Sequence, residues 1–262
     1  MPESTLKVSA ALLVALAIGA AAARAQVSDE ATPAAPSYKE SPGEFQFVRL
    51  AYAANQYGRG WGGRQIWQTD WPDAEYHFSR GIDRLTRIDV ALGGHVLTAR
   101  DESIYDYPWI YAVEVGYWTL NDPEAARLRD YLLRGGFLMV DDFHGTFEWG
   151  GFVATMEKVF PDRPIVDIPE VHEIFHVVYD LDHRIQIPSR MFIRSGVTWE
   201  RDGYTPHWRG IYDDEGRLMV AINFNMDIGD AWEHADWPDY PENMTALAYR
   251  FGINYVIYAM TH

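Results

Sequence analysis

The clearest chemical cluster in this 262-residue sequence is a pair of aspartates followed by a histidine. Asp141 and Asp142 come directly after the apolar run 137–140, and His144 stands two positions further on. Such side chains can hold a metal ion or act as general acid and base. They can equally cap the next helix and make one buried hydrogen bond. Because they follow an expected strand, we interpret all three as candidate ligand-binding residues and Asp141 as a candidate general base.

A second cluster matches the zinc-protease pattern H-E-x-x-H. His172, Glu173 and His176 have the required spacing, which works only on a helix, where the two imidazoles one turn apart face one ion. Pro169 precedes the motif, and the residues after it are β-branched and aromatic, so a helix is disfavoured here. We therefore expect either a non-helical pair of histidines lining a cleft or ordinary core and surface histidines.

Two loops rich in polar residues or glycine complete the chemistry. The segment 223–233 places several oxygen-bearing side chains after an expected strand, which could hold Ca²⁺ or hydrogen-bond a sugar, although the full calcium-loop pattern is missing. A helix-capping loop explains it equally well. Gly58, Gly60 and Gly63 have dinucleotide-binding spacing, but Trp61 fills that loop and Trp71-Pro72 separates it from the next helix. Without a helix N-terminus to face a pyrophosphate, we expect a lid or a plain loop.

Composition excludes several classes of function. The sequence contains no cysteine, no G-x-S-x-G elbow and no phosphate-binding loop, which leaves thiol nucleophiles, serine hydrolases and nucleotide triphosphatases without support. The net charge is −16. Residues 1–25 carry only Glu3, Lys7 and Arg24, a net +1, so the remainder has a charge of −17. Such an acidic chain disfavours nucleic acid as a partner.

The first 25 residues are typical of a secretory signal. Lys7 precedes an apolar stretch over 8–23, and Ala23-Arg24-Ala25 matches a small-x-small cleavage site. We expect a signal peptide at 1–25, a flexible tether at 26–44 and a single α/β domain at 45–262. The mature protein would be periplasmic or secreted, with no membrane span after signal cleavage.

The elements that must position these residues form a β-α-β unit. Residues 109–115 are aromatic and β-branched, and Asn121 with Glu124 predicts a capped helix that runs to Arg134. The apolar run 137–140 then predicts a strand covered on both faces, hence parallel to the first. Ligands of parallel sheets bind at the carboxyl ends of strands. Further strands are expected at 45–52, 88–92, 165–168, 208–212 and 218–223, and further helices at 72–85, 152–160 and 244–260.

Four motifs in order resemble the bacterial domain of unknown function 4159 family over 45–262. The resemblance implies an α/β fold with a central, mostly parallel sheet flanked by helices, similar to flavodoxin and to class I glutamine amidotransferases. It implies no established activity, although family members often occur beside exported or membrane-associated partners. Glu173 departs from the proline expected in the family, and the missing cysteine rules out amidotransferase chemistry. The motifs are Asp70-Trp-Pro-Asp73-Ala-Glu75-Tyr76 with Leu85-Thr-Arg-Ile88, Gly135-Gly-Phe-Leu-Met-Val-Asp141-Asp142-Phe143, His172-x-x-Phe175-His176-x-x-Tyr179-Asp180-Leu181, and Asn225-x-Asp227-x-Gly229-Asp230-Ala-Trp232-Glu233.

Three functions remain in competition. The first is an exported, envelope-associated domain without established catalysis, which binds a glycan or peptide at the strand ends. The second is a metal-assisted hydrolase with Asp141 or Glu173 as general base, and the third is a structural subunit of an envelope complex. No cofactor is expected beyond a possible divalent metal. The expected ligand-binding residues are Tyr52, Trp61, Asp141, Asp142, His144, Asn225, Asp227, Asp230 and Trp232. The expected metal ligands are Asp142, His144, His172 and His176.

Overall fold

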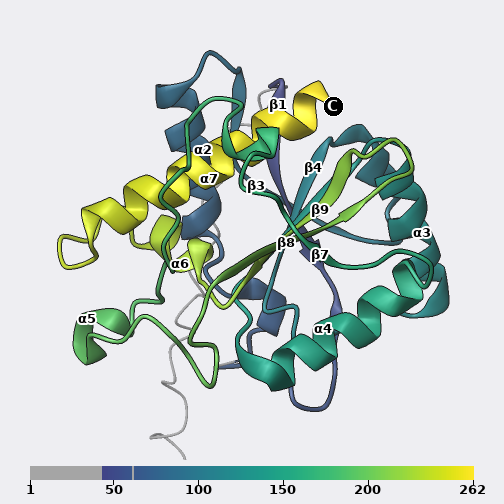
Figure 1. The fold of residues 1–262 in the computed structure, drawn as a ribbon, viewed down its shortest axis with the longest axis horizontal. Coiled ribbons are helices and arrows are strands. Elements are labelled where there is room, and N and C mark those ends of the chain that lie inside the picture. Colours follow the sequence, from purple (N-terminus) through teal and green to yellow (C-terminus); the bar gives the residue numbers. More distant parts are fainter. Residues whose placement is uncertain (1–42, 61) are drawn as a thin grey trace, which may run out of the picture. The chain divides into compact units, whose positions relative to one another are not determined.

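Short apolar and aromatic segments pair into one central sheet, which the computed structural model describes within residues 43–60 and 62–262 (Figure 1). The predicted signal peptide, most of the predicted tether and Trp61 lie outside the described residues. The sheet has seven strands in the order β3-β1-β4-β6-β9-β8-β7. Their bounds are β1 Phe45–Ala51, β3 Val90–Thr98, β4 Trp109–Val113, β6 Phe137–Asp141, β7 Val166–Asp167, β8 His207–Tyr212 and β9 Leu218–Phe224.

The sheet is mostly parallel. The strands β3, β1, β4, β6 and β9 run parallel to their neighbours, whereas β8 pairs antiparallel with both β9 and β7. Counted along the chain, the five consecutive parallel strands have the order 2-1-3-4-5, which is the order of flavodoxin-like sheets. The predicted α/β class with a mostly parallel sheet is therefore confirmed. A small separate ribbon joins β2 (Ala53–Ala54) to β5 (Trp118–Thr119).

Both edges of the sheet are irregular. The edge strand β7 has only two residues, and its neighbour β8 shifts register against β9 between Ile211 and Tyr212. At the other edge, the pairing of β3 with β1 shifts register between Gln46 and Phe47, opposite the Gly93 region. Gly93 has a φ of 95°, a left-handed conformation that glycine adopts without steric cost.

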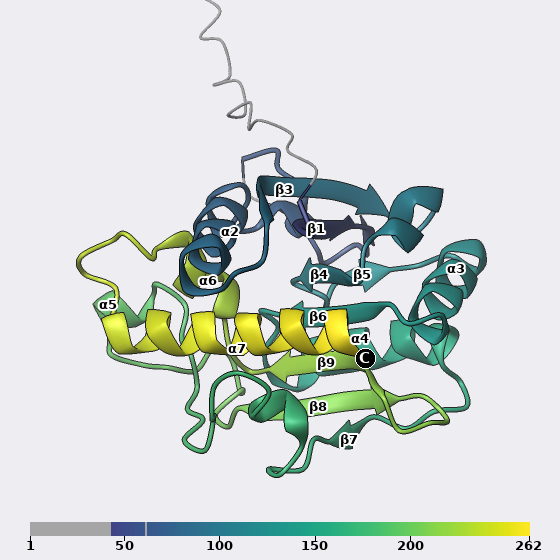
Figure 2. The ribbon, with the colours of Figure 1, turned by 90° about the horizontal axis from the view of Figure 1, so that it is seen from above.

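Helices cover both faces of the sheet (Figures 1 and 2). On one face, α2, α6 and α7 bury aromatic residues such as Phe78, Trp232 and Phe251 in one core. On the other face, α3 and α4 bury Leu128 and Phe152 in a second core. The helix bounds are α2 Asp73–Leu85, α3 Asp122–Leu133, α4 Gly145–Val159, α5 Phe192–Ser195, α6 Ile228–Glu233 and α7 Glu242–Thr261, with 3-10 turns at η1 Ile66–Gln68, η2 Glu102–Asp106 and η3 Glu173–Phe175.

Local signals account for some elements better than for others. The helix α3 begins as predicted, because Asn121 accepts a hydrogen bond from the Glu124 amide and the Glu124 side chain caps in return. The helix α4 begins at Gly145, well before the predicted start at 152. Its glycines lower helix propensity but permit close packing: a Cβ on Gly151 would lie 2.1 Å from the Gly116 carbonyl oxygen.

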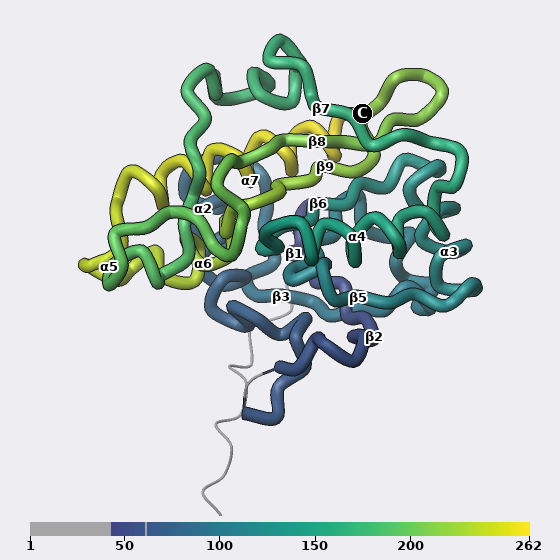
Figure 3. Tube along the Cα trace, turned by 60° about the horizontal axis from the view of Figure 1, so that its bottom comes forward, coloured from purple at the N-terminus to yellow at the C-terminus, as the bar shows by residue number. Residues whose placement is uncertain are grey.

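The C-terminal helix α7 docks onto the sheet, as expected. Leu247, Phe251, Tyr255 and Tyr258, which predicted its buried face, are all buried. In the part of the chain that the structure describes, no helix is long and apolar enough to cross a membrane. The connection 168–206 carries α5, which lies near α6 (Figures 1 and 3).

Candidate functional site

Three neighbouring strands end in polar residues with an unusual backbone. Glu114 after β4, Asp142 after β6 and Asn225 after β9 have φ values of 55°, 51° and 64°. Left-handed conformations are uncommon for residues other than glycine, and such strain tends to gather at functional sites. We call the carboxyl ends of the parallel strands the carboxyl edge. The sequence predicted the site there, and three polar residues with left-handed backbone lie side by side at this edge.

Adjacent carboxylates leave β6 on opposite faces, because side chains alternate along a strand. Asp141 points toward α6, where its Oδ2 accepts hydrogen bonds from the Ile228 and Gly229 amides at 2.7 and 2.9 Å. Its Oδ1 is buried and has no hydrogen-bond partner. Burial raises the pKa of Asp141 to about 7, against the opposing effect of these hydrogen bonds. Asp141 thus ties the start of α6 to the sheet.

Three further aspartates meet beside Asp141, and we call them the Asp70 cluster. One carboxylate oxygen from each of Asp70, Asp227 and Asp230 lies within 4.8 Å of the other two. Asp227 caps α6, since its Oδ1 accepts the Asp230 amide at 2.7 Å, and Asp230 Oδ2 accepts the Arg190 amide at 2.7 Å. Burial and neighbouring carboxylates raise the pKa of Asp70 and of Asp227 well above the usual range.

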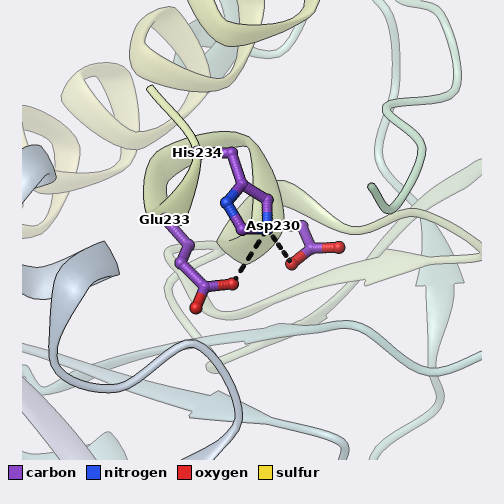
Figure 4. A group of neighbouring side chains, drawn as sticks. All are labelled: Asp230, Glu233 and His234. Atoms are coloured by element: carbon purple, nitrogen blue, oxygen red, sulfur yellow. Dashed lines mark ion pairs between the residues drawn. The ribbon is translucent and has the colours of Figure 1, made fainter. Parts of the chain in front are cut away.

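Asp230 also belongs to a second group with Glu233 and His234 (Figure 4). The His234 Nε2 atom lies 3.5 Å from Asp230 Oδ1 and 3.1 Å from Glu233 Oε2. Burial lowers the pKa of His234, but the two carboxylates outweigh that effect and raise it overall. The imidazole of His234 therefore lies against two carboxylates, which favour its protonated form.

Glu233 and His234 line a surface cavity of about 530 Å³. The same cavity is lined by Trp237, whose side chain is 42% exposed, and by Tyr76. A second cavity of about 500 Å³ shares Tyr76, His77 and Asp236 with the first. We call the first cavity the acidic pocket, and its polar and aromatic lining residues are Asp73, Tyr76, His77, Glu233, His234, Asp236 and Trp237.

The other face of the carboxyl edge holds the predicted pair Asp142 and His144. The Nε2 of His144 lies 3.2 Å from Asp142 Oδ1, and both side chains are buried. Burial lowers the pKa of His144 to about 4 and, together with Glu114, raises that of Asp142 well above its usual range. His144 is therefore uncharged near pH 7, and its buried Nδ1 has no hydrogen-bond partner.

Several predicted ligand-binding residues have structural contacts instead of open positions. Tyr52 is buried, and its hydroxyl donates to the carbonyls of Val113 and Glu114 at 2.6 and 3.0 Å. Trp232 is fully buried and stacks on Phe78 with ring centroids 4.2 Å apart, so it has no face for a ligand. Trp61 lies outside the described residues.

The side chain of Asn225 makes hydrogen bonds to two other segments of the chain. Its Oδ1 accepts the Gly145 amide at 2.9 Å, and its Nδ2 donates to the Thr205 carbonyl at 2.7 Å. The amide side chain thereby joins the end of β9, the start of α4 and the connection before β8. These bonds use one donor and one acceptor of Asn225 inside the protein.

The structure does not bring the four predicted metal ligands together. Asp142 follows β6 at the carboxyl end of the strands. The His172 ring instead contacts Tyr212 and Tyr258 near the start of β9, at the opposite, amino end of the parallel strands. The H-E-x-x-H segment is a single 3-10 turn instead of an α-helix. His176 pairs with Asp180 at 3.0 Å. A single ion cannot be reached by both histidines and the Asp142–His144 pair.

Glu173, the second predicted general base, is equally remote from the carboxyl edge. Its side chain is exposed and lies 3.2 Å from the Nε2 of the C-terminal residue, His262. The residues that sequence reasoning overlooked are Asp70, Glu114 and His234, whereas Glu233 belongs to the polar segment 223–233 that was singled out. Asp70 and Glu233 stood in the quoted family motifs, but nothing in their spacing linked position 70 to positions 227–234. The link is made only by the packing of α2 against α6.

The fold and site together define a doubly wound α/β protein with an acidic carboxyl edge. The sequence matches the family described as "Domain of unknown function (DUF4159)" over residues 46–260. The chain belongs to this family, as the four motifs indicated. No curated protein matches the chain.

Proposed function

We propose that this protein is an exported, envelope-associated domain that binds a polar ligand, a glycan or a peptide, in the acidic pocket. The observation that carries the proposal is that the exposed Trp237 and the partly buried Glu233 and His234 line one cavity. Its volume of about 530 Å³ lies in the range of small-ligand sites.

The chemistry of the lining favours ligands that donate hydrogen bonds. Asp73, Glu233 and Asp236 offer carboxylate acceptors for hydroxyl, amide or ammonium groups. The indole of Trp237 and the ring of Tyr76 offer apolar faces on which a sugar ring or an aliphatic side chain can pack. The overall charge of −16 disfavours anionic ligands. A neutral sugar or a cationic peptide fits this combination best.

Export and the finer fold assignment belong to the same proposal. The apolar stretch 8–23 with Ala23-Arg24-Ala25 supports secretion. The strand order 2-1-3-4-5 supports a flavodoxin-like fold of the class I glutamine-amidotransferase type. A chain without cysteine cannot use the thiol nucleophile of those enzymes, so the proposal retains only the scaffold.

The test is isothermal titration of the purified protein with two probes, soluble peptidoglycan fragments and a short lysine-rich peptide. Trp237→Ala and Glu233→Gln should each weaken binding of the preferred probe by about tenfold, or about 1.4 kcal/mol. Trp199→Ala is the matched control, because Trp199 is equally exposed at 42% but does not line this cavity.

The outcome decides between ligand classes and can reject the site. Binding of the glycan fragments alone would assign a sugar, and binding of the peptide alone would assign a peptide. If neither probe binds, or if Trp199→Ala and Trp237→Ala behave alike, the acidic pocket is not the ligand site.

A further inference from the structure

We propose that Asp70, Asp227 and Asp230 hold a divalent cation at the carboxyl edge of the sheet. One oxygen from each carboxylate lies within 4.8 Å of the other two, and all three residues are buried. Such an all-oxygen set suits hard cations such as Mg²⁺, Ca²⁺ or Mn²⁺. This site is distinct from the acidic pocket, and the proposal stands whether or not that pocket binds a glycan or peptide.

The Asp70 cluster has more buried carboxylates than basic partners. In the described part of the chain, no basic side chain forms an ion pair with Asp70 or Asp227. The buried guanidinium of Arg49 pairs with Glu75 and donates to two backbone carbonyls, and His234 pairs with Asp230 and Glu233. Buried carboxylates without a partner are costly, and a bound cation offsets that cost.

An oxygen without a partner points into the cluster. Asp70 is only 6% exposed, and its Oδ2 has no hydrogen-bond partner. A Cβ built on Gly229 would lie 2.2 Å from this oxygen, so Oδ2 lies directly over the α6 turn that carries Asp227 and Asp230. Asp141 also leaves its Oδ1 without a partner beside the same turn. These two carboxylate oxygens have no hydrogen-bond partner in the protein and are free to act as metal ligands.

Asp230 links the buried cluster to residues of the acidic pocket. Asp230 is shared between the buried cluster and the group with Glu233 and His234, which lines the acidic pocket. The carboxylates of Glu233 and Asp230 therefore lie between the acidic pocket and the buried oxygens of Asp70 and Asp227. The Nε2 atom of His234 already contacts Asp230 and Glu233, so the ligand atoms left for the ion are carboxylate oxygens.

The first test uses the wild-type protein, treated with a chelator and then titrated with Tb³⁺. Emission is excited through tryptophan, because Trp71 and Trp232 neighbour cluster residues in the sequence. Saturable emission that Ca²⁺, Mg²⁺ or Mn²⁺ displaces is expected. An ion present at about 100 times its Kd should also raise Tm by about 5 °C or more. A wild-type protein with neither displaceable emission nor a shift in Tm would overturn the proposal without any variant.

The second test locates the ion with Asp70→Asn and Asp227→Asn. Asparagine tolerates the left-handed φ of 63° at position 70 and can still cap α6 at position 227. Each variant should weaken ion affinity at least about tenfold and raise Tm in the absence of ions, because a buried like charge is removed. This pair of opposite effects distinguishes a lost ligand from a damaged fold.

The matched control is Asp236→Asn, which removes an exposed carboxylate of the acidic pocket without touching the cluster. Ion affinity should stay as in the wild type. Equal ion affinity in the wild type, Asp70→Asn and Asp227→Asn would overturn the proposed site. Loss of ion binding in Asp236→Asn alone would move the ion to the surface and overturn it as well.

Discussion

Arg49 and Glu75 form an ion pair that is fully buried between β1 and α2. The Arg49 Nη1 also donates to the carbonyls of Trp67 and Thr69 at 3.1 and 2.9 Å, which fixes the segment leading to Asp70. A buried ion pair gives little net stability, but removal of one partner leaves an uncompensated charge. This pair therefore positions the loop that carries Asp70.

Glu75→Gln should lower the free energy of unfolding by about 3–5 kcal/mol, because the Arg49 guanidinium would stay buried without its counter-charge. Urea denaturation measures the effect. The double variant Arg49→Met/Glu75→Leu should recover most of the loss, since both charges are then absent. Asp162→Asn, which breaks the exposed Arg129–Asp162 pair, should have a much smaller effect. Equal losses for the buried and exposed pairs would contradict this account.

Glu114 should make stability depend on pH. Burial, then the nearby Glu148 and Glu200, raise the pKa of Glu114 from 4.5 to about 8, against the opposing charge of Arg201. The folded state therefore binds the proton more tightly than the unfolded chain does. This contribution to stability is fully present below the unfolded pKa and is lost as pH rises toward about 8.

Glu114→Gln tests that sign. Urea denaturation near pH 5 and near pH 9 should show a smaller fall in unfolding free energy for the variant than for the wild type. Glu157→Gln on the exposed face of α4 is the control and should leave the pH dependence unchanged. A wild-type protein that becomes more stable between these pH values would refute the assignment.

At the scale of elements, close packing between helices explains why glycine occurs in the middle of α7, where helix propensity would favour alanine. A Cβ on Gly252 in the middle of α7 would lie 2.4 Å from Phe78 Cε2 and 2.7 Å from Trp232 Cζ2. Glycine is otherwise about 1 kcal/mol less favourable than alanine inside a helix. Gly252 thus allows α7 to approach α2 and α6, the elements that carry the acidic pocket.

Gly252→Ala should lower the free energy of unfolding by about 1–3 kcal/mol, because the new methyl group overpacks the core and outweighs the gain in helix propensity. Gly150→Ala is the matched control, since a Cβ at position 150 of α4 would meet no atom within 4 Å. That variant should be up to about 1 kcal/mol more stable. Thermal denaturation compares the two, and stabilisation by both substitutions would show that Gly252 is not needed for packing.

The elements themselves were largely predictable where the signals are local. The capping box of Asn121 and Glu124 and the apolar run 137–140 predicted α3 and β6 closely. The early start of α4 was not predictable, because its glycines serve contacts with the Gly116 turn that are distant in the sequence. Local sequence rules predict helix caps and buried strands, but they do not predict glycines whose role is close packing between distant segments.

At the scale of the whole molecule, the fold determines which predicted residues meet. The parallel strands predicted that polar residues gather at the carboxyl ends of the strands, and Asp141, Asp142 and His144 lie there. The H-E-x-x-H spacing added His172 and His176, but His172 lies near the start of β9, at the opposite end of the parallel strands. The Asp70 cluster joins a loop before α2 to the turn after β9, and this contact depends on the packing of α2 against α6 on one face of the sheet. No spacing within the chain encodes such a contact.

The irregular edges of the sheet have a consequence for behaviour in concentrated solution. A long, flat edge strand is a template on which other chains can add, and this leads to aggregation. Here one described edge ends in the two-residue β7, and the other is interrupted by the register shift in β3. The β7 edge is too short to offer a row of free backbone groups, and the register shift limits the regular part of β3 to Gly94–Thr98, so both edges are poor templates for strand addition from one molecule to the next.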